Sequence, residues 1–321
     1  MCLFLVGCGN YTTKSFSKDF EKKVNKLNGY NISGVLEIKN NDDVYKYDVE
    51  VSYKKNDKYR VSLKNQTNNH EQIILRNKDG VYVLTPSLNK SFKFQSDWPY
   101  NNSQVYLLQT LLSDIKDSGK QNLNTSKDGY IVTTGVNYPN NSDLVAQKIY
   151  FDKKLVPKKV EVMDKDGNVL IKMVYNNVNL NAKFKNNYFE INENMKTAKT
   201  TGETKTVSKI ESEIYPMYIP ENTKLTNKEV VNLEHGQRVI MTFEGDNPFM
   251  FVEQTADVSD ELAIVSVYGE PYQLATSVAA ISDNMISWVS NGIEYYVVSD
   301  NMDEKDLISV ASSVATIPVS K

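Results

Sequence analysis

Apolar and polar residues alternate along most of the first 175 residues, almost without fault in residues 44–53 (VYKYDVEVSY). Successive side chains of a β-strand point to opposite faces, so this pattern predicts strands with one buried face. Turn-forming residues interrupt the alternation at short intervals, which predicts an antiparallel meander. We expect strands near residues 35–38, 44–53, 59–63, 72–75, 81–84, 92–94, 130–133, 146–151, 159–163 and 169–175.

A helical period replaces the alternation at the start of this region. In residues 19–27, the side chains of Phe20, Val24 and Leu27 fall on one face of a helix, and Ser17 is a candidate cap.

A second helix is expected over residues 104–116, with Asn102 or Ser103 as its cap. Its apolar stripe contains Leu107, Leu108, Leu111 and Leu112. Core packing is the first interpretation of this stripe, and a lid over an acyl-binding groove is the second. Together the elements predict an α+β fold, in which helices close the concave face of a long curved antiparallel β-sheet, a half-barrel.

A polar, threonine-rich stretch over residues 193–213 predicts a linker before a smaller α+β C-terminal domain, residues 214–321. The pair Asn291-Gly292 is a strong hairpin signal. A final helix would have Asn301 as its cap. Strands are expected near residues 238–243, 249–253, 263–267, 273–276, 285–289 and 293–298.

The balance of basic and acidic residues changes within the predicted linker. The 321 residues have a formal net charge of −3. Residues 1–200 carry 30 basic and 21 acidic side chains, whereas residues 201–321 carry 7 and 19. A basic first part and an acidic second part indicate two separately composed domains.

Candidate catalytic residues are scarce. The chain has only two histidines, His70 and His235, and both are expected in surface loops. The sequence contains no glycine-rich phosphate loop, nucleophile elbow or metalloprotease helix, so we expect neither an enzyme nor a metal site.

Two further patterns have simple structural interpretations. Asp164, Asp166 and Asn168 have the spacing of the opening of a calcium loop, but Tyr175 stands where the closing glutamate is needed, so we interpret them as a hairpin turn. Lysine pairs at 54–55, 153–154 and 158–159 indicate a solvated basic face, or a docking face for an acidic partner or anionic polymer.

The first residues suggest attachment to a membrane. Leu5-Val6-Gly7-Cys8 resembles a bacterial lipobox, in which the cysteine receives a diacylglycerol lipid. Because only seven residues precede Cys8 and none is basic, we expect the natural start to lie upstream. Residues 1–8 would be the signal remnant and lipobox and residues 9–18 a tether. The mature chain would lie on the extracytoplasmic face of the membrane, with the lipid on Cys8 as its only added group.

The order of elements over residues 19–192 resembles the LolA/LolB/RseB lipoprotein-carrier family. The segments that carry this likeness are 58–60, 79–86, 157–162, 166–168 and 175–178.

Two other segments narrow the resemblance. Residues 96–104 (SDWPYNNSQ) are similar to the branch of germination-specific lipoproteins (GerS) of spore-forming Gram-positive bacteria. Residues 214–316 resemble a small domain of unknown function found in Gram-positive lipoproteins and anti-sigma factors.

The resemblance implies a non-enzymatic lipoprotein of sporulation and germination, in the space between forespore and mother cell, that binds a cortex-modifying peptidoglycan amidase. Two alternatives remain open: a carrier of lipid or lipoprotein with a hydrophobic groove that holds acyl chains, and an envelope-stress regulator that binds an anti-sigma factor. Nucleic acid is not an expected partner.

Overall fold

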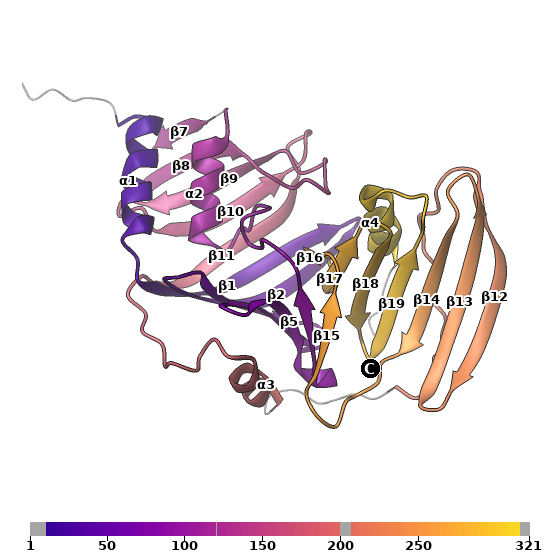
Figure 1. The fold of residues 1–321 in the computed structure, drawn as a ribbon. Helices are drawn as coiled ribbons and strands as arrows, with labels where there is room; N and C mark the ends of the chain where they lie inside the picture. Colours follow the sequence, from indigo (N-terminus) through magenta and orange to yellow (C-terminus); the bar gives the residue numbers. More distant parts are fainter. Residues whose placement is uncertain (1–10, 120, 200–206, 315–321) are drawn as a thin grey trace, which may run out of the picture.

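The computed structural model describes residues 11–119, 121–199 and 207–314. Two β-sheets dominate these residues, and the helices pack against their faces (Figure 1). The helices are α1 (Thr13–Asn25), α2 (Leu108–Asp117), α3 (Ile191–Lys199), α4 (Glu304–Ser313) and the short 3-10 helix η1 (Pro86–Leu88).

The larger sheet has 12 strands, and all its neighbours are antiparallel except one terminal pair. The first six strands form a meander, and the chain then returns so that β11 pairs with β1 at the middle of the sheet. From one edge to the other the strands are β15 (Ala263–Val267), β6 (Lys90–Phe94), β5 (Gly80–Thr85), β4 (Glu71–Asn77), β3 (Lys58–Asn65), β2 (Asp43–Lys54), β1 (Gly29–Asn40), β11 (Val169–Asn179), β10 (Pro157–Met163), β9 (Ala146–Asp152), β8 (Gly129–Gly135) and β7 (Asn122–Thr125).

Strand β1 shows why the sequence pattern produces this sheet. Its side chains alternate between buried and partly exposed, as the period of two predicts. The pairing of β1 with β11 shifts register at Ser33 and Gly34, where a side chain on Gly34 would collide with the carbonyl oxygen of Val174. Glycine is therefore required where the two central strands approach each other.

Helices α1 and α2 lie on the same face of the curved sheet, above it in Figure 1. Helix α1 buries Phe16, Phe20 and Val24 against the sheet. Its cap is Thr12, whose hydroxyl accepts a hydrogen bond from the backbone N–H of Ser15 at 3.2 Å. The predicted cap, Ser17, instead lies inside the helix, because α1 begins six residues earlier than its apolar spacing indicated.

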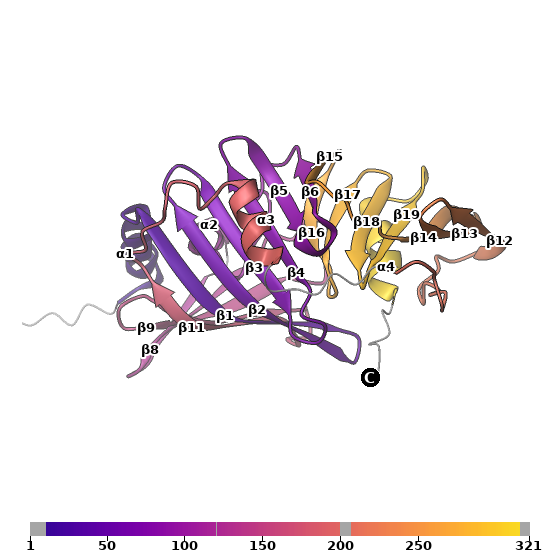
Figure 2. The ribbon, with the colours of Figure 1, turned by 90° about the horizontal axis from the view of Figure 1, so that it is seen from below.

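Helix α3 covers the opposite face of the sheet, as the view from below shows (Figure 2). It overlaps the end of the predicted first domain and the start of the predicted linker, residues 193–213. A small cluster on this face forms between α3, the segment before it and strands β4 and β5. Its buried residues are Ile73, Leu75, Tyr82, Leu84, Phe189 and Met195.

The second sheet has seven antiparallel strands, and α4 packs beside β18 and β19. Asp303 caps α4 in place of the predicted Asn301, because its side chain accepts the backbone N–H of Asp306 at 2.9 Å. In order the strands are β12 (Thr223–Leu233), β13 (Gly236–Gly245), β14 (Phe249–Thr255), β19 (Ile293–Val298), β18 (Met285–Ser290), β17 (Val278–Ser282) and β16 (Glu270–Gln273). The fold is thus the predicted curved antiparallel sheet covered by helices, with a smaller α+β unit beyond it.

One strand from the second part of the chain joins the first sheet. Strand β15 belongs in sequence to the second part of the chain, but it pairs in parallel with β6 at the edge of the first sheet. Next to this edge, the ammonium group of Lys90 contacts the carboxylate of Glu294 at 2.8 Å, and the two side chains are only 15% and 11% exposed. The hydroxyl of Tyr47 also donates to the carbonyl oxygen of Ala275 at 2.6 Å.

The buried Lys90–Glu294 pair generates a prediction about stability. Replacing Glu294 by Gln leaves the Lys90 ammonium without its counter-charge, so the free energy of unfolding should fall by roughly 3 kcal/mol, as for other buried pairs. The exposed pair Lys116–Glu21, with an N–O distance of 2.7 Å, provides the control. Glu21→Gln should cost less than about 1 kcal/mol. Urea denaturation checks both values, and equal effects of the two substitutions would contradict the prediction.

Candidate protein interface

Cys8, the predicted lipid-attachment residue, lies outside the described residues, so lipidation stays a prediction. Among the described residues, no helix combines the length and apolarity needed to cross a membrane.

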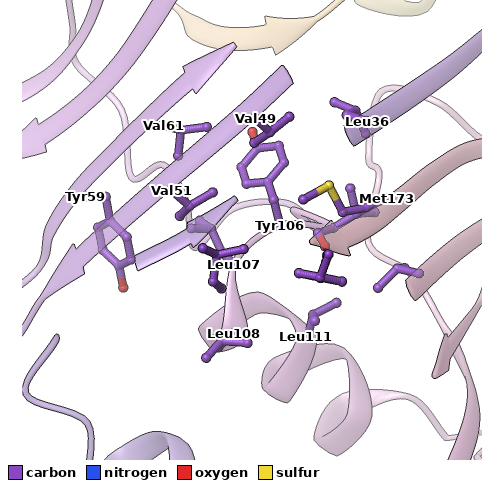
Figure 3. Packing of buried hydrophobic residues seen from close by; sticks show 14 of the residues in the cluster. Leu36, Val49, Val51, Tyr59, Val61, Tyr106, Leu107, Leu108, Leu111 and Met173 are labelled. Atoms are coloured by element: carbon purple, nitrogen blue, oxygen red, sulfur yellow. Dashed lines mark hydrogen bonds between the residues drawn. The ribbon is translucent and has the colours of Figure 1, made fainter. Parts of the chain in front are cut away.

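The four leucines of the predicted stripe lie in the largest hydrophobic core. Leu107, Leu108, Leu111 and Leu112 are all buried, at and after the start of α2. Figure 3 shows the first three of them beside strand residues such as Val51 and others from the sheet. These contacts are those expected of core packing, and the lid over an acyl-binding groove stays a prediction.

Helix α2 also carries a buried acid that the sequence analysis missed. The carboxylate of Asp114 accepts hydrogen bonds from the hydroxyl of Ser103 at 2.8 Å and from the side-chain amide of Gln147 at 2.6 Å. Ser103 was predicted as the cap of this helix, but α2 begins after Leu107 and has no side-chain cap. Burial raises the pKa of Asp114 to about 6, which the two hydrogen bonds only partly offset.

Asp114 makes stability depend on pH. Because its pKa is higher in the folded chain than in the unfolded chain, the unfolding free energy falls as pH rises between about 4 and 6. Asp114→Asn removes the ionisable group, and with it the fall in unfolding free energy as pH rises. Rotation of the Gln147 side-chain amide lets its unpaired oxygen accept a hydrogen bond from the new asparagine. We expect the variant to be more stable than the wild type by roughly 1–2 kcal/mol at pH 8 and to lose this advantage at pH 4.

Urea denaturation at the two pH values measures this difference. Asp117→Asn, an exposed substitution in the same helix, serves as the control and should change stability little at either pH. Lower stability of Asp114→Asn at pH 8 would show that the ionised carboxylate is stabilising.

The two histidines lie far apart in the sequence and have different environments. His235 is exposed, as predicted. His70 is partly buried, contrary to the prediction. The hydroxyl oxygen of Ser87 lies 3.4 Å from Nδ1 of its ring. Burial lowers the pKa of His70.

Asp164 and its neighbours form a turn. The Asp164 carboxylate accepts hydrogen bonds from the backbone N–H groups of Asp166 and Asn168 at 2.9 and 2.8 Å. The side-chain amide of Asn168 donates to it as well, and this bond is the main cause of the lowered pKa of Asp164. The hairpin-turn interpretation is confirmed, and in the described part of the chain no group of three or more acidic, histidine or cysteine residues is placed to hold a metal ion.

The predicted lysine pairs are spread over separate places in the large sheet. Residues 54–55 lie at the end of β2, residues 153–154 in the turn after β9, and residues 158–159 in β10. Several of these lysines are engaged within the chain: Lys159 forms an ion pair with Glu161 at 2.6 Å.

An exposed apolar segment stands out in the acidic second part of the chain. Residues 215–219 (YPMYI) precede β12, and Met217 is 81% exposed. Tyr215, Tyr218 and Ile219 are also exposed. We call these five residues the 215–219 segment. Monomeric proteins rarely gather exposed apolar side chains, so such a cluster marks an interaction site.

The 215–219 segment is held in place at both ends. Pro216 within the segment and Pro220 directly after it are buried. Before the segment, the backbone N–H of Ile214 donates to the buried carboxylate of Glu253 at 2.8 Å. Within it, the backbone N–H of Met217 contacts the carbonyl oxygen of Ser313 at 3.4 Å, next to α4. Because these contacts already restrict the backbone of the segment, less conformational entropy is lost when a partner binds.

Acidic groups surround this segment. Glu213 forms an ion pair with Lys228 of β12 at 2.7 Å, which lowers the pKa of Glu213. On the other side, burial and the charges of Asp306, Glu221 and Asp303 raise the pKa of Tyr218. Apolar residues within an acidic rim fit a partner that offers an apolar pocket with basic residues around it.

Comparison with known proteins shows the class to which this chain belongs. Residues 1–189 match the family described as sporulation protein YdcC-like, and the chain belongs to this family. The sporulation protein YdcC of Bacillus subtilis (strain 168) is 32% identical over 317 residues, which cover 97% of this chain and 93% of the relative. The chain is therefore related to sporulation, and the predicted resemblance to a family of spore-forming Gram-positive bacteria is confirmed.

Solved structures give more distant similarities. The MucA/MucB complex of Pseudomonas aeruginosa is 12% identical, with 93% and 98% of the two chains covered and a TM-score of 0.33. The complex of the CwlD amidase with the GerS lipoprotein of Clostridioides difficile is 18% identical, with coverages of 54% and 96% and a TM-score of 0.24. A LolA superfamily protein from Nitrosomonas europaea is 11% identical, with coverages of 57% and 99% and a TM-score of 0.31. TM-scores this low define no function for this chain.

Proposed function

We propose that the protein is a membrane-anchored, non-enzymatic lipoprotein of sporulation that acts by binding another protein. Its family supports the role in sporulation. The observation that carries the binding role is the 215–219 segment, an anchored apolar cluster with acidic residues beside it. The partner we propose is the one implied by the resemblance to germination-specific lipoproteins, a cortex-modifying peptidoglycan amidase.

The arrangement of side chains supports binding over chemistry or transport. His235 is exposed, and His70 has a single weak contact with Ser87, so neither has the oriented partners of a general base. The leucines of α2 already pack within the core, whereas a carrier needs apolar side chains that line an open groove.

Met217 provides the direct test of partner binding. Replacing it by Asp places a charge at the centre of the apolar segment without disturbing the fold, because the side chain is already exposed. The affinity for the cortex amidase of the same organism should fall by roughly 30-fold or more, as for a central interface residue. Binding of the two purified proteins, measured by calorimetry, gives this ratio.

Val44→Asp is the matched control. Val44 is 52% exposed in β2, a strand of the first sheet, so the substitution adds the same charge at another exposed apolar position. It should leave the affinity unchanged. The proposal fails if the wild-type protein does not bind the amidase, or if both substitutions weaken binding equally.

Membrane anchoring has a separate test. Cys8→Ser removes the thiol that would receive the lipid, so we expect the protein to move from the membrane fraction to the soluble fraction of sporulating cells when the membranes are washed in about 1 M salt, which screens attraction between charges. The control is Cys2→Ser, because Cys2 precedes the predicted processing site. Equal membrane retention of both variants would contradict lipidation at Cys8.

A further inference from the structure

Helix α1 presents a row of lysines to solvent. Lys14, Lys18 and Lys22 recur every four residues, and Lys26 follows at the same spacing as the cap of the helix. Residues four apart lie one above the other on a helix, so the lysines share one side. We call these four residues the α1 lysine row. All four are exposed, and within the described residues none of them forms an ion pair.

The acidic residues of α1 form no ion pair with this row, and the single negative charge of Asp19 offsets its four positive charges only in part. Asp19 accepts a hydrogen bond from the hydroxyl of Tyr11 at 2.9 Å. Glu21 is paired with Lys116 of α2 at 2.7 Å, so its charge is already balanced by a lysine outside the row.

Further basic residues lie beside the C-terminal end of α1. The ammonium group of Lys23 donates to the carbonyl oxygen of Lys154 at 2.7 Å, which places the turn after β9 against α1. Lys153 and Lys154 are exposed in this turn. The outer surface of α1 is therefore continuous with a second basic segment.

We propose that the α1 lysine row docks helix α1 on an anionic lipid surface, with the ammonium groups at the phosphates of the headgroups. This inference rests on the proposed anchor at Cys8, because only four residues lie between Cys8 and Thr13, the first residue of α1. The five Cα–Cα steps between them span at most about 17 Å, so the anchor would let α1 reach the membrane surface. Once α1 touches the headgroups, its ammonium groups lie within the screening length of about 8 Å in physiological salt and contribute to binding.

The distribution of charge selects one orientation. Helix α1 lies at one end of the molecule and β12 at the other (Figures 1 and 2). The acidic second part, with 19 acidic and 7 basic side chains in residues 201–321, is repelled by the same anionic surface. Docking through α1 therefore turns the 215–219 segment away from the membrane, because Glu213, two residues before the segment, pairs with Lys228 of β12.

Vesicle binding of the full chain carrying Cys8→Ser tests docking without the lipid. We expect this protein to sediment with vesicles that contain phosphatidylglycerol and not with phosphatidylcholine vesicles. Binding should disappear near 1 M salt, where screening acts over about 3 Å. Replacing the α1 lysine row by Gln should lower the vesicle partition coefficient by about tenfold or more.

The control replaces four other exposed lysines, which belong to the first sheet region but lie away from α1. They are Lys39 at the end of β1, Lys78 between β4 and β5, Lys165 between β10 and β11, and Lys196 in α3. This variant has the same net charge as the row variant and should keep its partition coefficient within about twofold of the starting protein.

Other outcomes overturn the proposal. Equal losses in the two variants would show that net charge alone drives binding. Binding to phosphatidylcholine as strong as to phosphatidylglycerol would exclude headgroup charge. Row-dependent binding to a soluble anionic cell-wall polymer without binding to vesicles would assign the row to that polymer. Because lipid attachment is absent from this experiment, its result is separate from the fractionation of Cys8→Ser in cells and from amidase binding.

Discussion

The structure depends on the parallel pairing of β15 with β6. Without it, the first sheet would end in an open edge at β6, and the second sheet would contact the first only through side-chain interactions such as that of Gln72 with the backbone N–H of Val278 at 2.7 Å. The pairing covers that edge and places Glu294 beside Lys90, where the two charges are largely removed from water. The edge of the first sheet is then the short strand β15, and the pairing couples the second part of the chain to this sheet.

The sequence predicts the elements of this fold better than their connections. Alternation in residues 44–53 identifies β2 because one face of that strand is buried. The strand β12 was missed because both of its faces are exposed, so its residues show no period of two. The joining of β15 to the first sheet was missed for a different reason: its five residues predict a strand, but only long-range contacts decide which edge the strand joins.

The candidate interface could be predicted only in part. The apolar run at 215–219 is visible in the sequence, but the sequence analysis treated it as the start of the second domain. An apolar run usually becomes buried, and exposure at Met217 results from the buried prolines on either side and the contact with Ser313. The acid Asp114 was likewise hidden, because its neighbours Ser103 and Gln147 approach only after the sheet and α2 have formed.

The two proposals place membrane contact at α1 and partner contact at the 215–219 segment. The most direct measurement uses a photo-reactive amino acid at position 217 in sporulating cells, compared with one at position 268. Tyr268 is also highly exposed, but it lies beside β15. We expect a covalent adduct with the cortex amidase at position 217 and none at position 268. Absence of an amidase adduct at 217, or equal adducts at both positions, would contradict it.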